Sequence, residues 1–401
     1  VTMDGTGAHG FGVVDDACVV VDADRIAWLG RRVDAPPLGG VKRVDARGAC
    51  VMPGLVDCHT HLVFAGERSD EFARRARGET YAQIMAAGGG IRSTMNKVRA
   101  ASLDALVDDT MTRAHALSRR GVTTVEIKSG YGLDVENELK MLRAARIVGE
   151  RGPVDVVPTL LAAHAVPPEY DDDDHHDGGG ASAWVARIVS DPLPEVAREK
   201  LATSCDVFIE QNAFSVDDAR TLLRAAQSHG LHARVHAEQL THQGGAQLAA
   251  EVGALSAGHL EFVDDDDIAA LAKANVACEV LALAQVFLRG LRAIPGRKLV
   301  DAGCVVAGGT DGNPGTAMSS DLPLAAGLAV TQCGLTAEEA LRGMTVNAAR
   351  AVGLDDRGVL AAGKRADLVV LSGASPVDLV YRWSEPLARV VVRAGHVVWE
   401  A

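Results

Sequence analysis

One segment of the chain joins a buried-strand pattern to two histidines: Pro53-Gly54-Leu55-Val56-Asp57-Cys58-His59-Thr60-His61. Side chains two apart on a β-strand point to the same side, so His59 and His61 can present their imidazole rings to one point in space. Neutral imidazoles are good ligands for borderline divalent metals such as zinc or iron. The segment therefore predicts a strand that ends in a metal-binding pair.

This strand is the first of eight strand-like stretches that alternate with helical ones. The eight stretches are residues 49–57, 121–128, 154–163, 205–210, 231–236, 254–258, 276–281 and 304–309. Most of the sequence between them has helical periodicity and is rich in Ala, Leu, Arg and Glu, as in residues 136–146. Eight strands that alternate with helices over about 300 residues predict an α/β fold, a (β/α)8 TIM-type barrel, more than an open doubly wound sheet.

Both ends of the chain differ from the middle, because they hold short β-rich pieces broken by Asp and Gly. These pieces are residues 17–22, 25–30, 366–371, 389–393 and 396–399. Chain termini commonly lie close together, so the pieces can pair into one sheet. We expect residues 1–48 with 357–401 to form a small composite, β-sandwich-like domain, and residues 49–356 to form the barrel.

The overall composition excludes several classes of protein. The chain has 401 residues, of which 48% are hydrophobic and 4% aromatic, and a formal net charge of −13. Such a chain is not wholly disordered, and its acidity disfavours binding to nucleic acid or to an anionic membrane. It has no apolar run near 18 residues, so we expect no membrane-spanning helix. It also has no positively charged N-terminal segment followed by an apolar stretch, so we expect no secretory signal. Its seven scattered cysteines favour reduced thiols in the cytoplasm.

An acidic, glycine-rich segment lies at residues 171–180, with four Asp followed by two His, one Asp and three Gly. Two interpretations are open: a metal-binding loop, or a solvated insertion between barrel elements. The second is favoured, because a run of like charges repels itself and stays hydrated.

Further polar residues stand where later strands are expected to end: His236, His259 and Asp311. Taken singly, each could be a hydrogen-bonded polar residue at a strand end. Together with the His59/His61 pair they form an ordered series at strand carboxyl ends, where barrel active sites gather. The remaining histidines, such as His115, His229 and His232, are interpreted as surface or packing residues.

Several further motifs carry a family resemblance. They are residues 66–68 (Gly66-Glu67-Arg68), 87–94, 126–133, 163–170 and 313–316 (Asn313-Pro314-Gly315-Thr316). With the two-histidine segment and residues 358–370, they make the sequence similar to the amidohydrolase superfamily and, within it, to the imidazolonepropionase family of histidine degradation. The resemblance covers most of the chain.

The resemblance implies one divalent metal ion, zinc or iron, bound by His59, His61, His236 and Asp311. It also implies that the hydrolytic water binds this metal, with Asp311 as proton acceptor and His259 as the group that orients the water. A metal of this kind lowers the pKa of its water towards about 7 and polarises the carbonyl group under attack. The implied reaction opens the ring of 4-imidazolone-5-propanoate at its cyclic amide C–N bond and yields N-formimidoyl-L-glutamate.

The implied partner is thus a small molecule with a carboxylate tail. Arg68 suits this tail, because a guanidinium group can pair with both carboxylate oxygens. By the same resemblance, the other residues around the substrate are Tyr81, Tyr131, His164, Gln239, Asn313, Gly315 and Thr316. The loop of the last two is expected to offer backbone amides.

One position departs from related deaminases, which carry Glu where this chain has Gln239. An amide cannot shuttle protons, so the proton route is expected to run through Asp311, His259 or water. Two other hypotheses remain: an aminohydrolase acting on a guanine- or cytosine-like ring, and a barrel that has lost its metal and only binds ligands. A homodimer is also left open.

Overall fold

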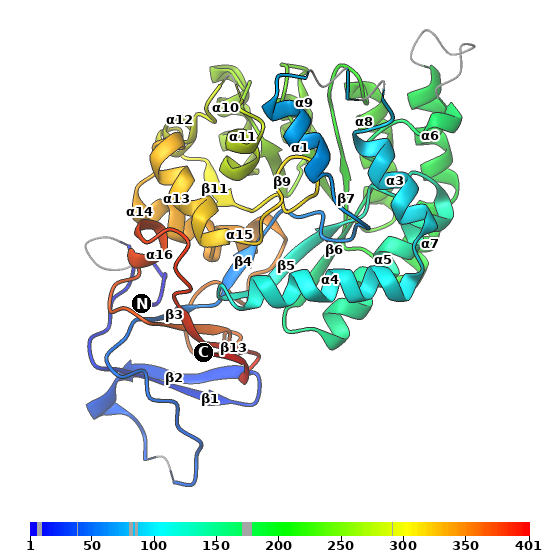
Figure 1. Cartoon of the computed structure of the whole chain (residues 1–401). Helices are drawn as coiled ribbons and strands as arrows, with labels where there is room; N and C mark the ends of the chain where they lie inside the picture. The colour runs from blue at the N-terminus through cyan, green and yellow to red at the C-terminus, as the bar shows by residue number, and fades with distance from the viewer. Residues whose placement is uncertain (6–9, 38, 80–82, 85–86, 171–178, 291) are drawn as a thin grey trace.

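The computed structural model describes residues 1–5, 10–37, 39–79, 83–84, 87–170, 179–290 and 292–401. Eight parallel strands form one sheet in chain order, from β4 to β11. They are β4 Leu55–Asp57, β5 Val122–Lys128, β6 Asp155–Ala163, β7 Ser204–Val207, β8 His232–Ala237, β9 Ser256–His259, β10 Ala277–Val280 and β11 Val305–Gly308. The predicted (β/α)8 barrel is confirmed, and its strands lie within a few residues of the predicted stretches (Figure 1). Tyr81 and residues 171–178 fall outside the described ranges.

Helices surround this sheet and connect its strands (Figure 1). They are α1 Ser69–Ala76, α3 Ile91–Ala100, α4 Leu103–Ser118, α5 Val135–Arg151, α6 Gly179–Ser190, α7 Pro192–Glu199, α8 Val216–Ser228, α9 Gly245–Val252, α10 Asp265–Ala274, α11 Ala282–Phe287, α12 Gly296–Asp301, α13 Leu322–Cys333, α14 Ala337–Gly343 and α15 Val346–Ala351. Local sequence sets where several of them begin. Ser215, for example, caps α8 by accepting a hydrogen bond from Asp218 N, while the Asp218 carboxylate accepts from Ser215 N. None of the helices in the described ranges is long and apolar enough to cross a membrane.

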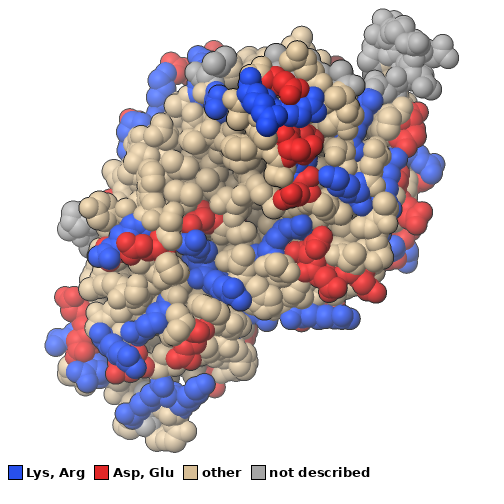
Figure 2. All heavy atoms as spheres, viewed as in Figure 1, with Lys and Arg blue, Asp and Glu red and all other residues tan. Residues whose placement is uncertain are grey.

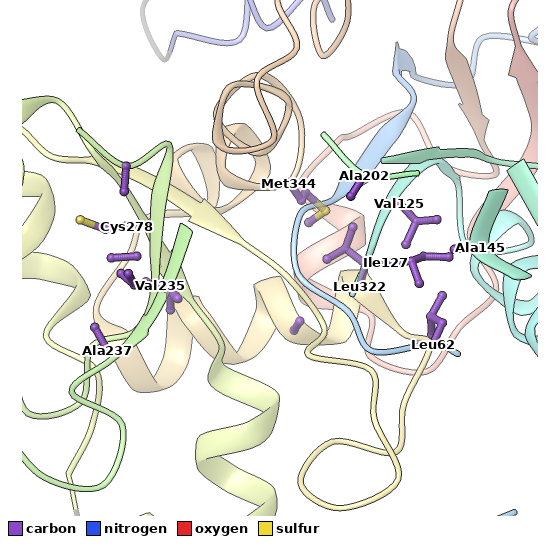
Figure 3. Packing of buried hydrophobic residues seen from close by; sticks show 14 of the residues in the cluster. Leu62, Val125, Ile127, Ala145, Ala202, Val235, Ala237, Cys278, Leu322 and Met344 are labelled. Carbon is purple, nitrogen blue, oxygen red and sulfur yellow. The ribbon is translucent and has the colours of Figure 1, made fainter. Parts of the chain in front are cut away.

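The barrel strands show a two-residue alternation between apolar and charged side chains. In β5, Val125 and Ile127 pack beside Ala145 of α5 (Figure 3). Their neighbours Glu126 and Lys128 are fully buried and point the other way, because successive side chains on a strand face opposite sides. The barrel interior is therefore charged, and the apolar core lies between the strands and the helices.

The barrel closes between its first and last strands through residues beyond both strand ends. Thr60 and Gly312 form a parallel bridge. His59 O accepts a hydrogen bond from Asp311 N at 2.9 Å, and His61 N donates to Gly312 O at 3.1 Å. The backbone of the predicted metal ligands thus forms the seam of the barrel.

The chain termini build two further sheets beside the barrel (Figure 1). One is a hairpin of β1 Ala17–Asp22 and β2 Arg25–Arg31, and the other has the order β14-β13-β12-β3. The strands of the second sheet are β3 Val51–Pro53, β12 Leu368–Leu371, β13 Ala388–Arg393 and β14 His396–Glu400, with α16 Asp378–Tyr381 between β12 and β13. Apolar residues of both sheets, such as Ile26 and Leu368, share one small core, which confirms a β-sandwich-like unit from both termini.

Two details differ from expectation. The predicted strand 49–57 is divided at Gly54: β3 pairs with β12 in the terminal sheet, whereas β4 pairs with β5 in the barrel. The β1–β2 hairpin does not join the four-stranded sheet; it packs against that sheet and forms a single bridge from Arg25 to Arg365. The four-stranded sheet thus takes only β3 from the N-terminal part. The domain limits at residues 48/49 and 356/357 stay a prediction.

Candidate active site

Four side chains from three strand ends converge on one point above the barrel. His59 Nε2 lies 3.1 Å from His236 Nε2, which lies 3.4 Å from His61 Nε2. The Asp311 carboxylate completes the group, with its Oδ1 at 3.3 Å from His61 Nε2 and 3.7 Å from His59 Nε2. His259 lies beside them, its ring centroid 5.4 Å from that of His236. All five side chains are buried, and the structure brings together the whole predicted set.

The backbone at two of these residues adopts a conformation that side chains rarely allow. Asp311 has φ of 55° and His259 has φ of 78°, both in the left-handed region. Hydrogen bonds to neighbouring strands hold both turns: Asp311 N donates to His59 O, and Leu260 N donates to Ala237 O. Such strain commonly occurs where a side chain must be aimed at a functional site.

The hydrogen bonds of two histidines fix which nitrogen faces the centre. His59 Nδ1 lies 2.7 Å from Glu279 Oε2, and His236 Nδ1 lies 3.1 Å from Asp206 Oδ1. An ionised carboxylate can only accept a hydrogen bond. Each Nδ1 therefore carries the hydrogen, and each Nε2 exposes a lone pair. Two lone pairs face one another across 3.1 Å, an arrangement that a shared cation would stabilise.

The donor set fits a metal ion in two further respects. Ligands at about 2.05 Å in a tetrahedral site lie roughly 3.3 Å apart, which is close to the distances between these donor atoms. The buried charges around them are also unbalanced. The carboxyl groups are Asp57, Glu126, Asp206, Glu279 and Asp311, whereas the cations are Lys128 and Arg234. A divalent cation would offset much of this excess of negative charge.

Burial controls the ionisation of the site. It is the main cause that holds the pKa of His59 and His61 well below the usual 6.5, and nearby cations such as Lys128 act in the same direction. Burial also lowers the pKa of His259 to about 3 and raises the pKa of Asp311. The imidazoles of His59, His61 and His259 are therefore neutral near pH 7, which is the form that binds metals.

Sequence reasoning missed the charged residues beneath the ligands. Asp206 links His236 to Lys128, whose Nζ lies 2.8 Å from Asp206 Oδ2. Glu279 links His59 to Arg234, whose Nη2 donates to Glu279 Oε1 at 2.6 Å. A signal was present, because Asp206, Arg234 and Glu279 each stand between two apolar residues of a predicted barrel strand, where an unpaired charge would be costly.

A cavity of about 1270 Å³ opens from the candidate metal ligands to the surface. Of the residues predicted to surround the substrate, those that the structure describes all line it: Arg68, Tyr131, His164, Gln239, Asn313, Gly315 and Thr316. His164 stacks on His61 at 5.1 Å between ring centroids, and its Nδ1 lies 3.0 Å from Gly130 O. The predicted surface histidines, His115, His229 and His232, are exposed.

The loop after β11 is held by one of its own side chains. Asn313 Oδ1 accepts hydrogen bonds from Gly315 N at 2.8 Å and Thr316 N at 2.7 Å. Both amides, expected to be offered to a ligand, are thus engaged within the loop. Thr316 Oγ1 in turn donates to Asp311 Oδ2 at 3.2 Å, so the loop orients the carboxylate of this candidate metal ligand.

Glu238 and Gln239, which follow β8, take different directions. Gln239 lines the cavity, as expected. Glu238 is fully buried and accepts hydrogen bonds from Gln243 N at 2.6 Å and Ala246 N at 3.1 Å, so its carboxylate is used at the start of α9. It does not replace the missing carboxylate at position 239.

Comparison with known proteins agrees with this geometry. A model of the amidohydrolase family matches residues 67–399. An imidazolonepropionase from Myxococcus xanthus (strain DK1622) is 50% identical over 384 residues, covering 95% of this chain and 90% of the relative. Another, from Anaeromyxobacter dehalogenans (strain 2CP-1 / ATCC BAA-258), is 47% identical over 395 residues, covering 97% of this chain and 92% of the relative.

Among solved structures, a 5-methylcytosine deaminase from Klebsiella pneumoniae liganded with phosphonocytosine matches with a TM-score of 0.73. The match covers 96% of this chain and 94% of that one at 17% identity, which supports the fold alone. The family model and the curated relatives span most of the sequence. The chain therefore belongs to the amidohydrolase family and, within it, to the imidazolonepropionase family.

Proposed function

We propose that this chain hydrolyses 4-imidazolone-5-propanoate to N-formimidoyl-L-glutamate, a step of histidine degradation. In this reaction water adds to the ring carbonyl carbon, the bond from that carbon to the ring nitrogen breaks, and the nitrogen leaves with a proton. The observation that carries the proposal is the identity of 42–50% to curated imidazolonepropionases along nearly the whole chain. The cavity above a His/Asp cluster gives the reaction a place.

One divalent metal ion, zinc or iron, would be held by His59, His61, His236 and Asp311. When bound, it would act as a Lewis acid that polarises the carbonyl group and makes water a stronger acid. The donor set of imidazoles and one carboxylate suits either metal. Support comes from the facing lone pairs of His59 and His236. Their Nε2 atoms lie 3.1 Å apart, and a shared cation would stabilise this arrangement.

Proton transfer is assigned to Asp311 and His259. Asp311 takes the proton of the attacking water, and the hydrogen bond from Thr316 Oγ1 keeps its carboxylate in place. His259 orients the water from the neighbouring strand end. Gln239 contributes binding only, because an amide neither accepts nor donates a proton in catalysis.

Substrate binding is assigned to the residues around the cavity. Arg68 pairs with the propionate group, since Glu71 occupies only its Nε and Nη2 and leaves Nη1 available. Tyr81, Tyr131, His164, Asn313, Gly315 and Thr316 surround the ring and the tail. We further propose that the protein acts in the cytoplasm, in keeping with seven cysteines that are all free; a homodimer is left open.

An absorbance assay tests the reaction. Purified, metal-loaded protein should consume freshly generated imidazolonepropionate without releasing ammonia, measured in parallel. Ammonia release from a guanine- or cytosine-like ring would favour the aminohydrolase hypothesis instead. Metal-loaded protein that turns over none of these compounds would favour the binding-protein hypothesis.

Arg68→Met tests the assignment of the substrate tail. Loss of a charge-assisted contact worth about 1.5–3 kcal/mol should lower kcat/KM roughly ten- to a hundred-and-fifty-fold. Lysine should restore only part of this, since it keeps the charge but loses the planar group. Metal content should not change. An equal loss on a substrate without the carboxylate would show that Arg68 has a structural role.

A further inference from the structure

Helix α1 carries a buried carboxylate that makes no contact with the metal centre. Glu71 is 5% exposed and pairs with Arg68, whose Nε and Nη2 donate to Glu71 Oε2 at 2.9 and 2.7 Å. Its other oxygen, Oε1, accepts a hydrogen bond from Gly90 N at 2.9 Å. Each oxygen of this carboxylate therefore has at least one N–H partner within the protein.

These contacts determine which edge of Arg68 can meet a ligand. A guanidinium group has two edges that can pair with carboxylates, one at Nε/Nη2 and one at Nη1/Nη2. Glu71 covers the first edge. Glu71 makes no hydrogen bond to Nη1, and Arg68 lines the cavity, so the second edge is the one left for a second carboxylate.

The loop after β11 also packs against Arg68. A Cβ atom on Gly315 would lie 2.4 Å from Arg68 Nη1, so only glycine allows the guanidinium to lie where it does. Arg75, one turn after Glu71 on α1, donates from Nη2 to Gly315 O at 3.1 Å and so holds this loop against the helix. Arg68 is thus fixed between Glu71 and Gly315.

We propose that Glu71 is a positioning residue that orients Arg68 for substrates with a carboxylate tail. Glu71 acts on the substrate through Arg68, and it selects for a carboxylate at a fixed place relative to the proposed metal ligands. Without it, the guanidinium would lose two charge-assisted hydrogen bonds and the fixed orientation they provide. The inference rests on the proposed function for the identity of the substrate, but not for the geometry of the pair.

A double-mutant cycle separates positioning from a general structural role. The four proteins are the wild type, Glu71→Gln, Arg68→Met and the double variant. We expect Glu71→Gln to lower kcat/KM for imidazolonepropionate roughly tenfold, mainly through KM, in the wild-type background. In the Arg68→Met background the same change should cost less than about twofold. Equal losses in both backgrounds would overturn the proposal.

Binding of a stable probe keeps the test independent of turnover. The dissociation constant of 3-(imidazol-4-yl)propanoate should rise about tenfold in Glu71→Gln, whereas that of 4-methylimidazole, which lacks the carboxylate, should not change. If the wild type hydrolyses nothing but this pattern is seen, the proposed function fails and the positioning role stands. If both probes weaken equally, the positioning role fails.

Further variants control for misfolding and test the position of Arg68 independently of Glu71. Glu71→Asp keeps the charge and should recover part of the affinity for the carboxylate probe. Gly315→Ala should displace the same guanidinium from the opposite side and weaken the same probe. Glu251→Gln is the matched control, because Glu251 makes a comparable pair with Arg220 on the exposed surface. Unchanged binding in both Glu71→Gln and Gly315→Ala would overturn the proposal.

Discussion

The two ends of the barrel each hold a cluster of charged side chains, and the clusters differ in what completes them. At the amino end, Asp155 of β6 meets three arginines from the C-terminal segment. Arg357 Nη1 lies 2.8 Å, Arg365 Nη2 2.7 Å and Arg393 Nη1 3.5 Å from its carboxylate oxygens. At the carboxyl end, imidazole nitrogens face one another, and carboxyl groups outnumber cations.

The amino-end cluster thus has a structural role, whereas the carboxyl-end cluster is suited to bind a ligand. In the amino-end cluster each arginine pairs with a carboxylate of the same chain. This cluster therefore needs no ligand from outside the chain. The carboxyl-end cluster has lone pairs that no described side chain satisfies, so it needs something that the chain does not supply. The outer surface fits neither description, since Figure 2 shows Lys and Arg interspersed with Asp and Glu on the face in view.

Removal of residues 357–401 should have the largest effect on this comparison. It deletes all three arginines of the amino-end cluster together with β12, the ladder partner of β3. We expect an insoluble protein, because unpaired strand edges invite aggregation. Solubility and circular dichroism of the truncated chain measure this. A soluble, folded and fully active product would show that the terminal sheets are dispensable.

Replacement of a metal ligand comes next. His59→Ala or Asp311→Ala should abolish hydrolysis and lower metal content while the fold survives, because these side chains stand at strand ends and not in the apolar core. Turnover, elemental analysis and thermal melting of each variant provide the check. Turnover like that of the wild type with metal still bound would refute the ligand assignment.

Removal of the metal should reproduce this result without mutation. Dialysis against a chelator is expected to eliminate activity, and addition of zinc or ferrous iron should restore it. Asp155→Ala, a variant of the amino-end cluster, keeps every proposed ligand and should therefore lose and regain activity as the wild type does. Full activity in protein shown by elemental analysis to be metal-free would contradict the proposed centre.

The carboxylates that orient the ligands should have an intermediate effect. Glu279→Gln or Asp206→Asn would replace the charged acceptor of His59 or His236 with a neutral amide, and metal affinity should fall about 10–100-fold. Competition with a chelating dye measures this affinity. Glu195→Gln, in an exposed pair with Arg143, is the control. An unchanged affinity would show that these carboxylates only balance charge.

Asp155→Ala should have the smallest effect, and on stability alone. It leaves three arginines without their shared partner, which should lower the free energy of unfolding by about 1–3 kcal/mol, since the carboxylate is partly exposed. Urea unfolding with Asp217→Ala, an exposed ion-pair control, gives the value. A change in KM or metal affinity would break the distinction between the two clusters.

Much of the fold could be predicted because the signals are local. The eight barrel strands, the terminal β pieces and the order of ligand stations all follow from short patterns of apolar and polar residues. The division of residues 49–57 could not be predicted, because one continuous apolar run supplies strands to two sheets. Only contacts with β12 on one side of Gly54 and β5 on the other decide where it breaks.

The sequence by itself determined the strand-helix alternation, the residues at the strand ends and the kind of metal ligand. The tertiary structure alone decided which nitrogen of His59 and His236 faces the centre, since Glu279 and Asp206 come from distant strands. It also decided the partner of Arg68 and the engagement of the Gly315 and Thr316 amides. The physical reason is that hydrogen bonds depend on atoms a few ångströms apart, and barrel closure sets those distances.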